Sequence, residues 1–287
     1  MAKIGLIQVD NTIPYNIKTR QDMLIDLGTR CLEEGADLIF FPEAFQYVGN
    51  RDIIKTPETL IETSAAWKER CAALAKKYHA YVVPWDYTID DGHLHNTSYI
   101  LDRDGNEIGA YHKCNLTAGE LQKGLSRGMD YPVFDLDFGR IGIMICFDNY
   151  YPESAASLAN RGAQLILYPL YGDTLKPQWE LKLRTRAADH SLYVAACQLQ
   201  SYFDRTYTGM ADPEGNIIAK LEREATYTVV DIDMNRIVRS DTYANHPHGE
   251  NLREYLHKCR NYRAYTSLST EGTKPLEWDE IFFDGNR

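Results

Sequence analysis

The chain has 287 residues, 44% of them apolar and 25% charged, which is the composition of an ordinary soluble globular protein. Lysine and arginine together number 31 against 41 acidic residues, giving a net charge of −10 with no long basic run, so we expect no nucleic-acid partner. No stretch approaches the roughly 18 continuous apolar residues of a membrane span, so no membrane partner is expected. The 6 widely spaced cysteines are typical of reduced thiols in a cytoplasmic protein.

The first 90 residues alternate between predicted strands and predicted helices. Residues 3–9, 36–41 (ADLIFF) and 80–88 are β-rich apolar runs. Between them, apolar residues recur at helical spacing over residues 17–31 and again over residues 60–78. This β-α-β-α-β order predicts buried strands joined by helical crossovers, and therefore the α/β fold class.

The middle of the chain changes to hairpins before the α/β order returns. DDG at 90–92 and DRDGN at 102–106 are hairpin turns, residues 111–130 show no clear period and indicate a loop-rich insertion, and 133–137 and 140–145 are predicted strands. A helix from about Pro152, a strand over 163–168, a helix over 178–190 and a strand over 192–199 follow. With no Pro/Ser-rich linker, we predict one domain over 1–242. Residues 243–287, polar and aromatic in character, are a predicted tail that packs on this domain or on a partner subunit.

Cys146 is the candidate nucleophile because of its place in the sequence. It directly follows a buried strand and lies just before the predicted helix near Pro152. A thiol at a strand end is open to a cleft and close to free backbone N–H groups, which favours a thiolate and supplies oxyanion donors. Cys31, Cys71 and Cys197 lie on periodic apolar faces and are predicted to be core residues.

Two charged residues occupy positions comparable to that of Cys146. A cysteine nucleophile usually has a histidine base, but none of the 8 histidines follows an apolar strand in a suitable place. Glu43 follows the strand LIFFPE, and Lys113 follows a strand that ends at His112. A buried carboxylate can accept a thiol proton, and an ammonium group can stabilise an oxyanion.

Three segments carry a resemblance to a known family. FFPEAF (40–45), YHKCNLTAGE (111–120) and GIMICFDNYYPES (142–154) resemble the three motifs of the nitrilase superfamily of carbon–nitrogen hydrolases, and the similarity extends over roughly residues 1–235. The resemblance implies that Glu43 is the general base, that Lys113 stabilises the tetrahedral intermediate and that Cys146 is the nucleophile. It assigns Glu120 to orienting the lysine and the attacking water, and the backbone N–H of Phe147 to the oxyanion hole. It also implies a four-layer α-β-β-α sandwich and a homodimer or larger assembly.

The resemblance leads us to expect a hydrolase that cleaves a small amide or N-carbamoyl amine through a cysteine thioester and releases ammonia. Several superfamily members with carboxylated substrates have an arginine shortly after the nucleophile, where this chain has Asn149 and Tyr150. An unpaired buried carboxylate is costly, so we expect a neutral or cationic substrate end. A carboxylate bound by Arg184 or Arg205 would overturn this. The candidate substrate-binding residues are Tyr47, Asn149, Tyr150 and Trp179.

Other functions remain open at this point. A nitrilase or a thioester-based N-acyltransferase would use the same residues, and a non-catalytic interaction dimer would leave them idle. GLSRG at 124–128 fits the serine elbow G-x-S-x-G but lacks the strand before it and the helix after it.

Cofactor and metal signals are weak. The spacing of His246, His248 and His257 is weak for zinc, so no metal is expected. No phosphate-cradling glycine motif is present, so no nucleotide cofactor is expected. His93 and His95 share one face of a hairpin strand, which we predict to be solvated.

Overall fold

The structure is a computed structural model that describes residues 1–10, 16–172, 176–200, 206–221, 226–239 and 251–268. The chain divides into two compact units, Met1–Val238 and Arg239–Arg287. The second unit contains helix α6, Leu252–Cys259, and the 3-10 helix η4, Tyr262–Leu268. The predicted tail of residues 243–287 falls within this unit, and its packing on the domain or on a partner subunit stays a prediction. Within the described residues, no helix is long and apolar enough to cross a membrane.

The first sheet has the strand order β14-β1-β3-β4-β6-β5, and β7 also pairs with β6. Its strands are β1 Ala2–Ile7, β3 Leu38–Phe40, β4 Tyr81–Val83, β5 Trp85–Asp90, β6 His93–Leu101, β7 Glu107–His112 and β14 Tyr227–Ile232. As the order of elements predicts, β1, β3 and β4 run parallel, and the two hairpin turns make β5, β6 and β7 antiparallel. The strand predicted over residues 80–88 is divided at Pro84, which has no N–H for the ladder.

The second sheet has the order β13-β12-β11-β10-β9-β8, and β2 pairs with β11. Its strands are β2 Val9–Asp10, β8 Val133–Leu136, β9 Gly139–Ile143, β10 Leu165–Leu170, β11 Tyr193–Gln200, β12 Gly209–Ala211 and β13 Ile217–Lys220. Strands β9, β10 and β11 are parallel neighbours, and the strands next to them on either side, β8 and β12, are antiparallel to them. Parallel strands are buried on both faces, which explains their continuous apolar sequences.

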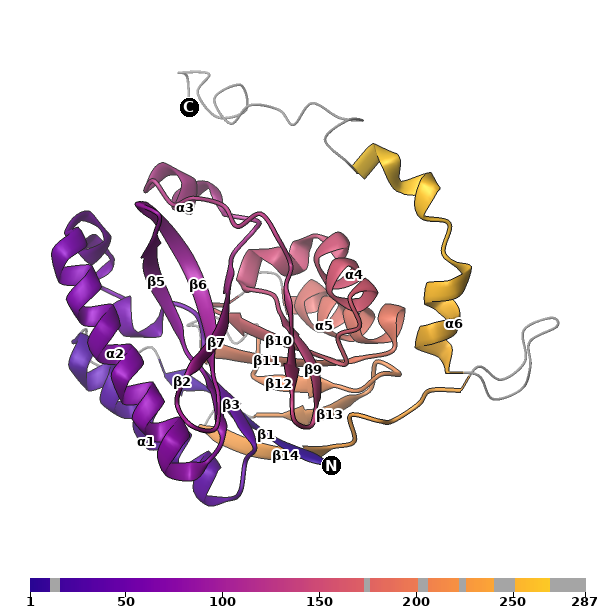
Figure 1. The fold of residues 1–287 in the computed structure, drawn as a ribbon, viewed down its shortest axis with the longest axis horizontal. Coiled ribbons are helices and arrows are strands. Elements are labelled where there is room, and N and C mark those ends of the chain that lie inside the picture. The colour runs from indigo at the N-terminus through magenta and orange to yellow at the C-terminus, as the bar shows by residue number, and fades with distance from the viewer. Residues whose placement is uncertain (11–15, 173–175, 201–205, 222–225, 240–250, 269–287) are drawn as a thin grey trace. The chain divides into compact units, whose positions relative to one another are not determined.

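The alternation of side chains along β10 shows how the layers form. Leu165 and Leu167 point into the core shared by the two sheets, whereas Ile166 and Tyr168 point into a second core under the helices. Helices α1, Ile17–Glu33, and α2, Pro57–Tyr78, cover the first sheet, and α4, Pro152–Asn160, and α5, Lys176–His190, cover the second (Figure 1). The expected four-layer α-β-β-α sandwich is confirmed.

The loop-rich insertion contains one short helix that the sequence did not predict, α3, Ala118–Gln122. Thr117 caps it, since its hydroxyl accepts from the Glu120 N–H while the Glu120 carboxylate accepts from the Thr117 N–H. Five residues are too few to show a helical period. The pattern Thr-x-x-Glu, however, is the sequence signature of this reciprocal cap.

The prediction of a solvated histidine face on β6 is wrong for His95. His93 is exposed, but His95 is buried and its ring stacks on that of His112 at 4.2 Å between centroids. The cause is the pairing of β7 with β6, which brings His112 next to Thr97 and covers this part of the strand.

Candidate active site

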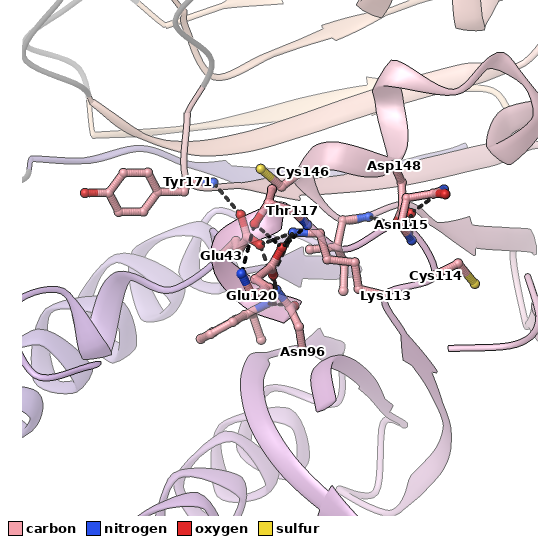
Figure 2. A network of polar contacts seen from close by, with 12 residues as sticks. Glu43, Asn96, Lys113, Cys114, Asn115, Thr117, Glu120, Cys146, Asp148 and Tyr171 are labelled. Carbon is pink, nitrogen blue, oxygen red and sulfur yellow. Dashed lines mark hydrogen bonds and ion pairs between the residues drawn. The ribbon is translucent and has the colours of Figure 1, made fainter. Parts of the chain in front are cut away.

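The polar groups of the site follow the carboxyl ends of strands from both sheets. Glu43 comes after β3, Lys113 after β7, Cys146 after β9 and Tyr171 after β10. The backbone N–H of Tyr171 donates to Glu43 Oε2 at 3.0 Å, which connects the first sheet to the second at this point. The fold therefore brings together the three residues that lie far apart in the sequence and were expected to share a site (Figure 2).

The ammonium group of Lys113 is buried between two carboxylates. Lys113 Nζ donates to Glu43 Oε1 at 2.9 Å and to Glu120 Oε1 and Oε2 at 2.9 and 3.0 Å. The side chain is only 1% exposed, so an unpaired charge would be very costly here. Burial alone would lower the pKa of Lys113, but Glu43, Cys146 and Glu120 outweigh it and hold this pKa well above its ordinary value. The lysine is therefore a fixed positive charge.

Glu120 is held in place by the N-terminal cap of helix α3, in whose first turn it lies. Its Oε2 accepts from both the backbone N–H and the hydroxyl of Thr117, each at 2.8 Å, as part of the cap of α3. Burial raises the pKa of the Glu120 carboxyl, but Lys113 and the Thr117 N–H overcome this effect, so the pKa is lowered. The carboxylate thus stays ionised next to Lys113.

Cys146 lies at a strained turn, and its surroundings raise the pKa of its thiol. It is the first residue of the 3-10 helix η3, Cys146–Tyr150, with a φ of +46°, a left-handed conformation that costs about 1–3 kcal/mol for a residue other than glycine. Its carbonyl oxygen accepts from the Tyr168 hydroxyl at 3.0 Å. Burial, followed by the Glu43 carboxylate, raises the pKa of the thiol well above its ordinary value although Lys113 opposes the shift. The thiolate expected from the sequence stays a prediction, and a thiol with a raised pKa needs a base before it can attack.

Sequence reasoning missed Asn96, which lies in β6. Its Nδ2 donates to Glu43 Oε1 at 2.8 Å and to Glu120 Oε1 at 2.7 Å (Figure 2). A single asparagine inside a hairpin strand has no local pattern that marks it. Asn96 could have been found only from the way the strands pair. Strand β6 lies between β5 and β7, and the N–H of Lys113, which follows β7, donates to the Asn96 carbonyl at 2.8 Å.

Asp148, also missed, connects the loop of Lys113 to the turn of Cys146. It is fully buried, and its carboxylate accepts from the Ile145 N–H at 2.9 Å, the Tyr111 hydroxyl at 2.6 Å and the Asn115 N–H at 2.9 Å. Tyr111 and Asn115 lie on either side of Lys113 in the sequence, whereas Ile145 precedes Cys146. One carboxylate therefore fixes two of the chain segments that form the site.

A cavity of about 270 Å³ opens over these groups. Among the described residues it is lined by Glu43, Ala44, Tyr87, Lys113, Thr117, Gly119, Glu120, Lys123, Cys146, Tyr171 and Gly172. Two carboxylates, two ammonium groups, two tyrosines and the thiol thus face a space the size of a small molecule.

None of the four predicted substrate-binding residues lines this cavity, and two of them lie in the core. Tyr47 is fully buried and donates its hydroxyl to Asp86 Oδ1 at 2.7 Å. Trp179 is 1% exposed and packs edge-on against Tyr207 at 4.6 Å between ring centroids, in the core between the second sheet and its helices. Tyr47 stacks on the cavity residue Tyr87 at 5.6 Å between ring centroids, so it supports the cavity wall without lining it.

The other two predicted residues, Asn149 and Tyr150, lie in η3 and contact α5. After Cys146 the chain turns into a 3-10 helix. The Asn149 carbonyl consequently accepts from Arg186 Nη2 at 3.1 Å, and the Lys182 ammonium lies 3.2 Å from the centre of the Tyr150 ring. Tyr87 and Tyr171 are the aromatic residues of the cavity instead.

Phe147 follows Cys146 in η3, and its ring packs against Tyr150 at 5.0 Å between centroids. The assignment of its backbone N–H to an oxyanion hole stays a prediction.

The motifs set aside in the sequence occupy other places. Ser126 follows helix α3 and precedes β8, the reverse of the strand–serine–helix order that an elbow requires. His246 and His248 lie outside the described residues. His257 Nδ1 shares a hydrogen bond of 2.7 Å with the Tyr262 hydroxyl. Within the described part of the chain, no group of three or more His, Cys, Asp or Glu side chains is placed to hold a metal ion.

Comparison with known proteins agrees with this geometry. The family model described as "Carbon-nitrogen hydrolase" matches residues 3–240. The chain is 28% identical to human omega-amidase NIT2 over 239 residues, which cover 74% of this chain and 86% of that protein. It is 28% identical to the deaminated glutathione amidase of a Synechocystis strain over 235 residues, 75% of this chain and 85% of that protein.

A solved structure has the same fold. The crystal structure of an amidase from Nesterenkonia sp. superposes with a TM-score of 0.75 at 21% identity, over 93% of this chain and 96% of that one. The match of the family model to most of the sequence is the stronger finding, since it extends from the first strand to the end of the first compact unit. The chain belongs to the carbon–nitrogen hydrolase family of the nitrilase superfamily.

Proposed function

We propose that this enzyme hydrolyses a small amide or N-carbamoyl amine and releases ammonia, with Glu43, Lys113 and Cys146 as catalytic residues and Glu120 assisting. The observation that carries this proposal is the Lys113 ammonium, which contacts both carboxylates at 2.9 Å in the cavity that Cys146 also lines. The curated relatives named above are amidases, which supports an amide as substrate.

The first half of the reaction forms a thioester. Glu43 accepts the thiol proton as Cys146 Sγ attacks the amide carbon, so that the sulfur becomes nucleophilic only during the attack. The developing oxyanion is stabilised by the Lys113 ammonium and, as we assign it, by the Phe147 N–H. The intermediate collapses, the C–N bond breaks, and the nitrogen takes the proton from Glu43 and leaves as ammonia.

The second half consumes water. Glu43 accepts a proton from a water molecule that attacks the thioester carbon, with Glu120 and Lys113 orienting the reacting groups. The C–S bond breaks, the sulfur takes up the proton from Glu43, and a carboxylic acid, or a carbamic acid from an N-carbamoyl substrate, leaves. Over both halves, one water is consumed and one ammonia is released. Glu43 and Cys146 return to their starting protonation states, because Glu43 passes on each proton that it accepts.

Lys123 bears on which charge the cavity accepts at the far end of the substrate. The expectation of a neutral or cationic end rested on the lack of an arginine after Cys146, but Lys123 lines the cavity. Arg184 donates to the Gly215 carbonyl at 2.8 Å, and Arg205 lies outside the described residues. Lys123→Met separates the two possibilities. If the substrate is neutral or cationic, the variant keeps its kcat/KM, whereas a carboxylated amide would lose about 10-fold or more.

Ammonia release from short aliphatic amides, N-carbamoyl amines and nitriles tests the proposed reaction. We expect wild-type release from an amide or N-carbamoyl amine and none from Cys146→Ala, with both proteins folded by circular dichroism. Ammonia release retained in Cys146→Ala would contradict the cysteine mechanism. Preference for a nitrile would favour the nitrilase alternative, and product formation that requires an added amine would favour the acyltransferase. A folded wild type that is inactive in every assay would favour the interaction dimer.

We also propose that the enzyme acts in the cytoplasm as a homodimer or larger assembly. All six cysteines are free, as is usual in a reducing compartment, and the family resemblance implies pairing between subunits. Size-exclusion chromatography with light scattering tests the assembly, and a monomer at micromolar concentration would contradict it.

A further inference from the structure

The side-chain amide of Asn96 lies between the two carboxylates of the site. Asn96 is 1% exposed, and its Nδ2 is 2.8 Å from Glu43 Oε1 and 2.7 Å from Glu120 Oε1. An amide nitrogen has two hydrogens, and here each carboxylate receives one of them. The Lys113 ammonium donates to the same two oxygens, at 2.9 Å each. The ammonium and the amide therefore join the two carboxylates from two directions.

The orientation of this amide is fixed by Trp85. The Trp85 Nε1–H donates to Asn96 Oδ1 at 2.6 Å, and an indole nitrogen can only donate. A reversed amide would place its NH₂ group against the indole N–H and its oxygen against both carboxylates, which are acceptors. Trp85 is fully buried, so no water replaces it. The indole thus ensures that Asn96 presents its two donors to the carboxylates.

The main chain of Asn96 supports the same group of residues. Its carbonyl oxygen accepts from the Lys113 N–H at 2.8 Å, which places the lysine directly beside the amide that shares its partners. Two carboxylates so close to one another repel, and the Lys113 ammonium lies between them. Each amide hydrogen bond of Asn96 adds a donor that stabilises the carboxylate accepting it.

We propose that Asn96 is a positioning residue of this active site, which holds Glu43 and Glu120 side by side as an ionised pair around Lys113 and thereby keeps Glu43 able to accept the Cys146 proton. The inference rests on the proposed roles of Glu43 and Cys146. It assigns Asn96 no contact with the reacting atoms.

Alkylation of Cys146 by iodoacetamide, followed from about pH 5 to 9, tests this role without turnover. Asn96→Asp keeps the shape but places a third carboxylate against the pair, which raises the pH at which the base becomes ionised. We expect the acid limb of the alkylation profile to move up by about one pH unit or more. In turnover of the best amide, kcat should fall about 100-fold while KM stays within about threefold.

Two further variants keep the proposal falsifiable. Trp85→Phe removes the donor that orients the amide, and we expect an acid limb shifted in the same direction with kcat reduced about 10-fold. Ser98→Ala is the matched control, because Ser98 is buried on the same strand and its hydroxyl has no hydrogen-bond partner among the residues that the structure describes. Its profile should match that of the wild type.

The outcomes separate this inference from the proposed function. An unshifted acid limb in folded Asn96→Asp and Trp85→Phe would overturn the positioning role, even if both had lost activity, because a purely structural role lowers the rate without moving the limb. If Asn96→Asp does not fold, Trp85→Phe alone decides. If the wild type hydrolyses no amide but the two variants still shift the alkylation profile, the proposed function is overturned and the role of Asn96 stands.

Discussion

Lys113 is a buried ammonium group with two carboxylate partners, and the chemistry of its neighbours follows from that arrangement. Glu43 and Glu120 both compensate the charge of Lys113. A substitution of either glutamate therefore removes an ion-pair partner of the lysine as well as the role assigned to that glutamate in the reaction. Removing one partner of a buried ion pair commonly costs about 3–5 kcal/mol. The two carboxylates nevertheless differ in their assigned roles, since only Glu43 is the base for the Cys146 thiol. Different measurements therefore separate them.

Glu43→Gln tests the base. The variant lacks the carboxylate that accepts the thiol proton in the proposed mechanism, so the sulfur has no base when it attacks the amide carbon. We expect kcat for ammonia release to fall about 10³-fold or more, in the range that general-base catalysis supplies. Glu62→Gln, an exposed glutamate on α2, is the control and should retain full activity. A Glu43→Gln protein with more than a tenth of the wild-type kcat would refute the assignment.

Glu120→Gln tests the electrostatics through stability. The pKa of Glu120 is lowered in the folded protein, so its ionised form stabilises the fold above the unfolded value of about 4.3, and this contribution is lost as the pH falls through the lowered value. The wild type should therefore lose more unfolding free energy between about pH 5 and 3 than the variant does. Urea unfolding at several pH values measures this, and parallel curves for the two proteins would contradict it.

At the scale of elements, Asp148 joins the segment after β7 to the turn after β9. Asp148→Asn keeps the size of the side chain but replaces one acceptor oxygen with a donor, facing groups that themselves donate. We expect a loss of about 2–4 kcal/mol in unfolding free energy and a lower kcat, because Lys113 and Cys146 lose their common anchor. Asp104→Asn, in an exposed turn, serves as control. Unfolding in urea and ammonia release give the two readouts, and an unchanged kcat would contradict the anchoring role.

The sequence predicted the parts of the site that depend on local order. Glu43 and Cys146 each follow an apolar strand, and strand ends are recognisable from composition alone. Asn149 and Tyr150, predicted as pocket residues, do not line the cavity but contact α5, and no local pattern encodes how η3 packs against that helix. Asn96 was missed for a related reason, since only the pairing of β5, β6 and β7 places it beside Lys113.

At the scale of the whole molecule, the structure has one core that lies between the sheets and extends under α1 and α2, and a second core between the second sheet and its helices. Trp179 belongs to the second core. Trp179→Ala should therefore lower the unfolding free energy by about 3–5 kcal/mol. The kcat per folded molecule should stay within about twofold, because the indole is not in the cavity lining. Urea unfolding and active-site-titrated kcat measure the two effects, and a large loss of kcat without a loss of stability would return Trp179 to the binding site.

The order of strands and helices predicted the α/β class, but the two packed sheets came only from the family resemblance. Periodicity shows that β10 and β11 are buried on both faces, yet it does not tell a helix layer from another sheet. The pairing of β14 with β1 joins residues more than 200 positions apart, and such a contact has no local signature. The paired sheets matter for function because Glu43 and Cys146 come from different sheets.

The thioester is tested most directly by intact-mass measurement of enzyme quenched with acid during turnover of a slowly hydrolysed amide. We predict that the mass of the wild type increases by that of the acyl group, that peptide mapping places the group on Cys146, and that Cys146→Ala shows no increase. Steady ammonia release with no adduct on the wild type, or an adduct on any other residue, would contradict the proposed convergence of Glu43, Lys113 and Cys146 on one substrate carbon.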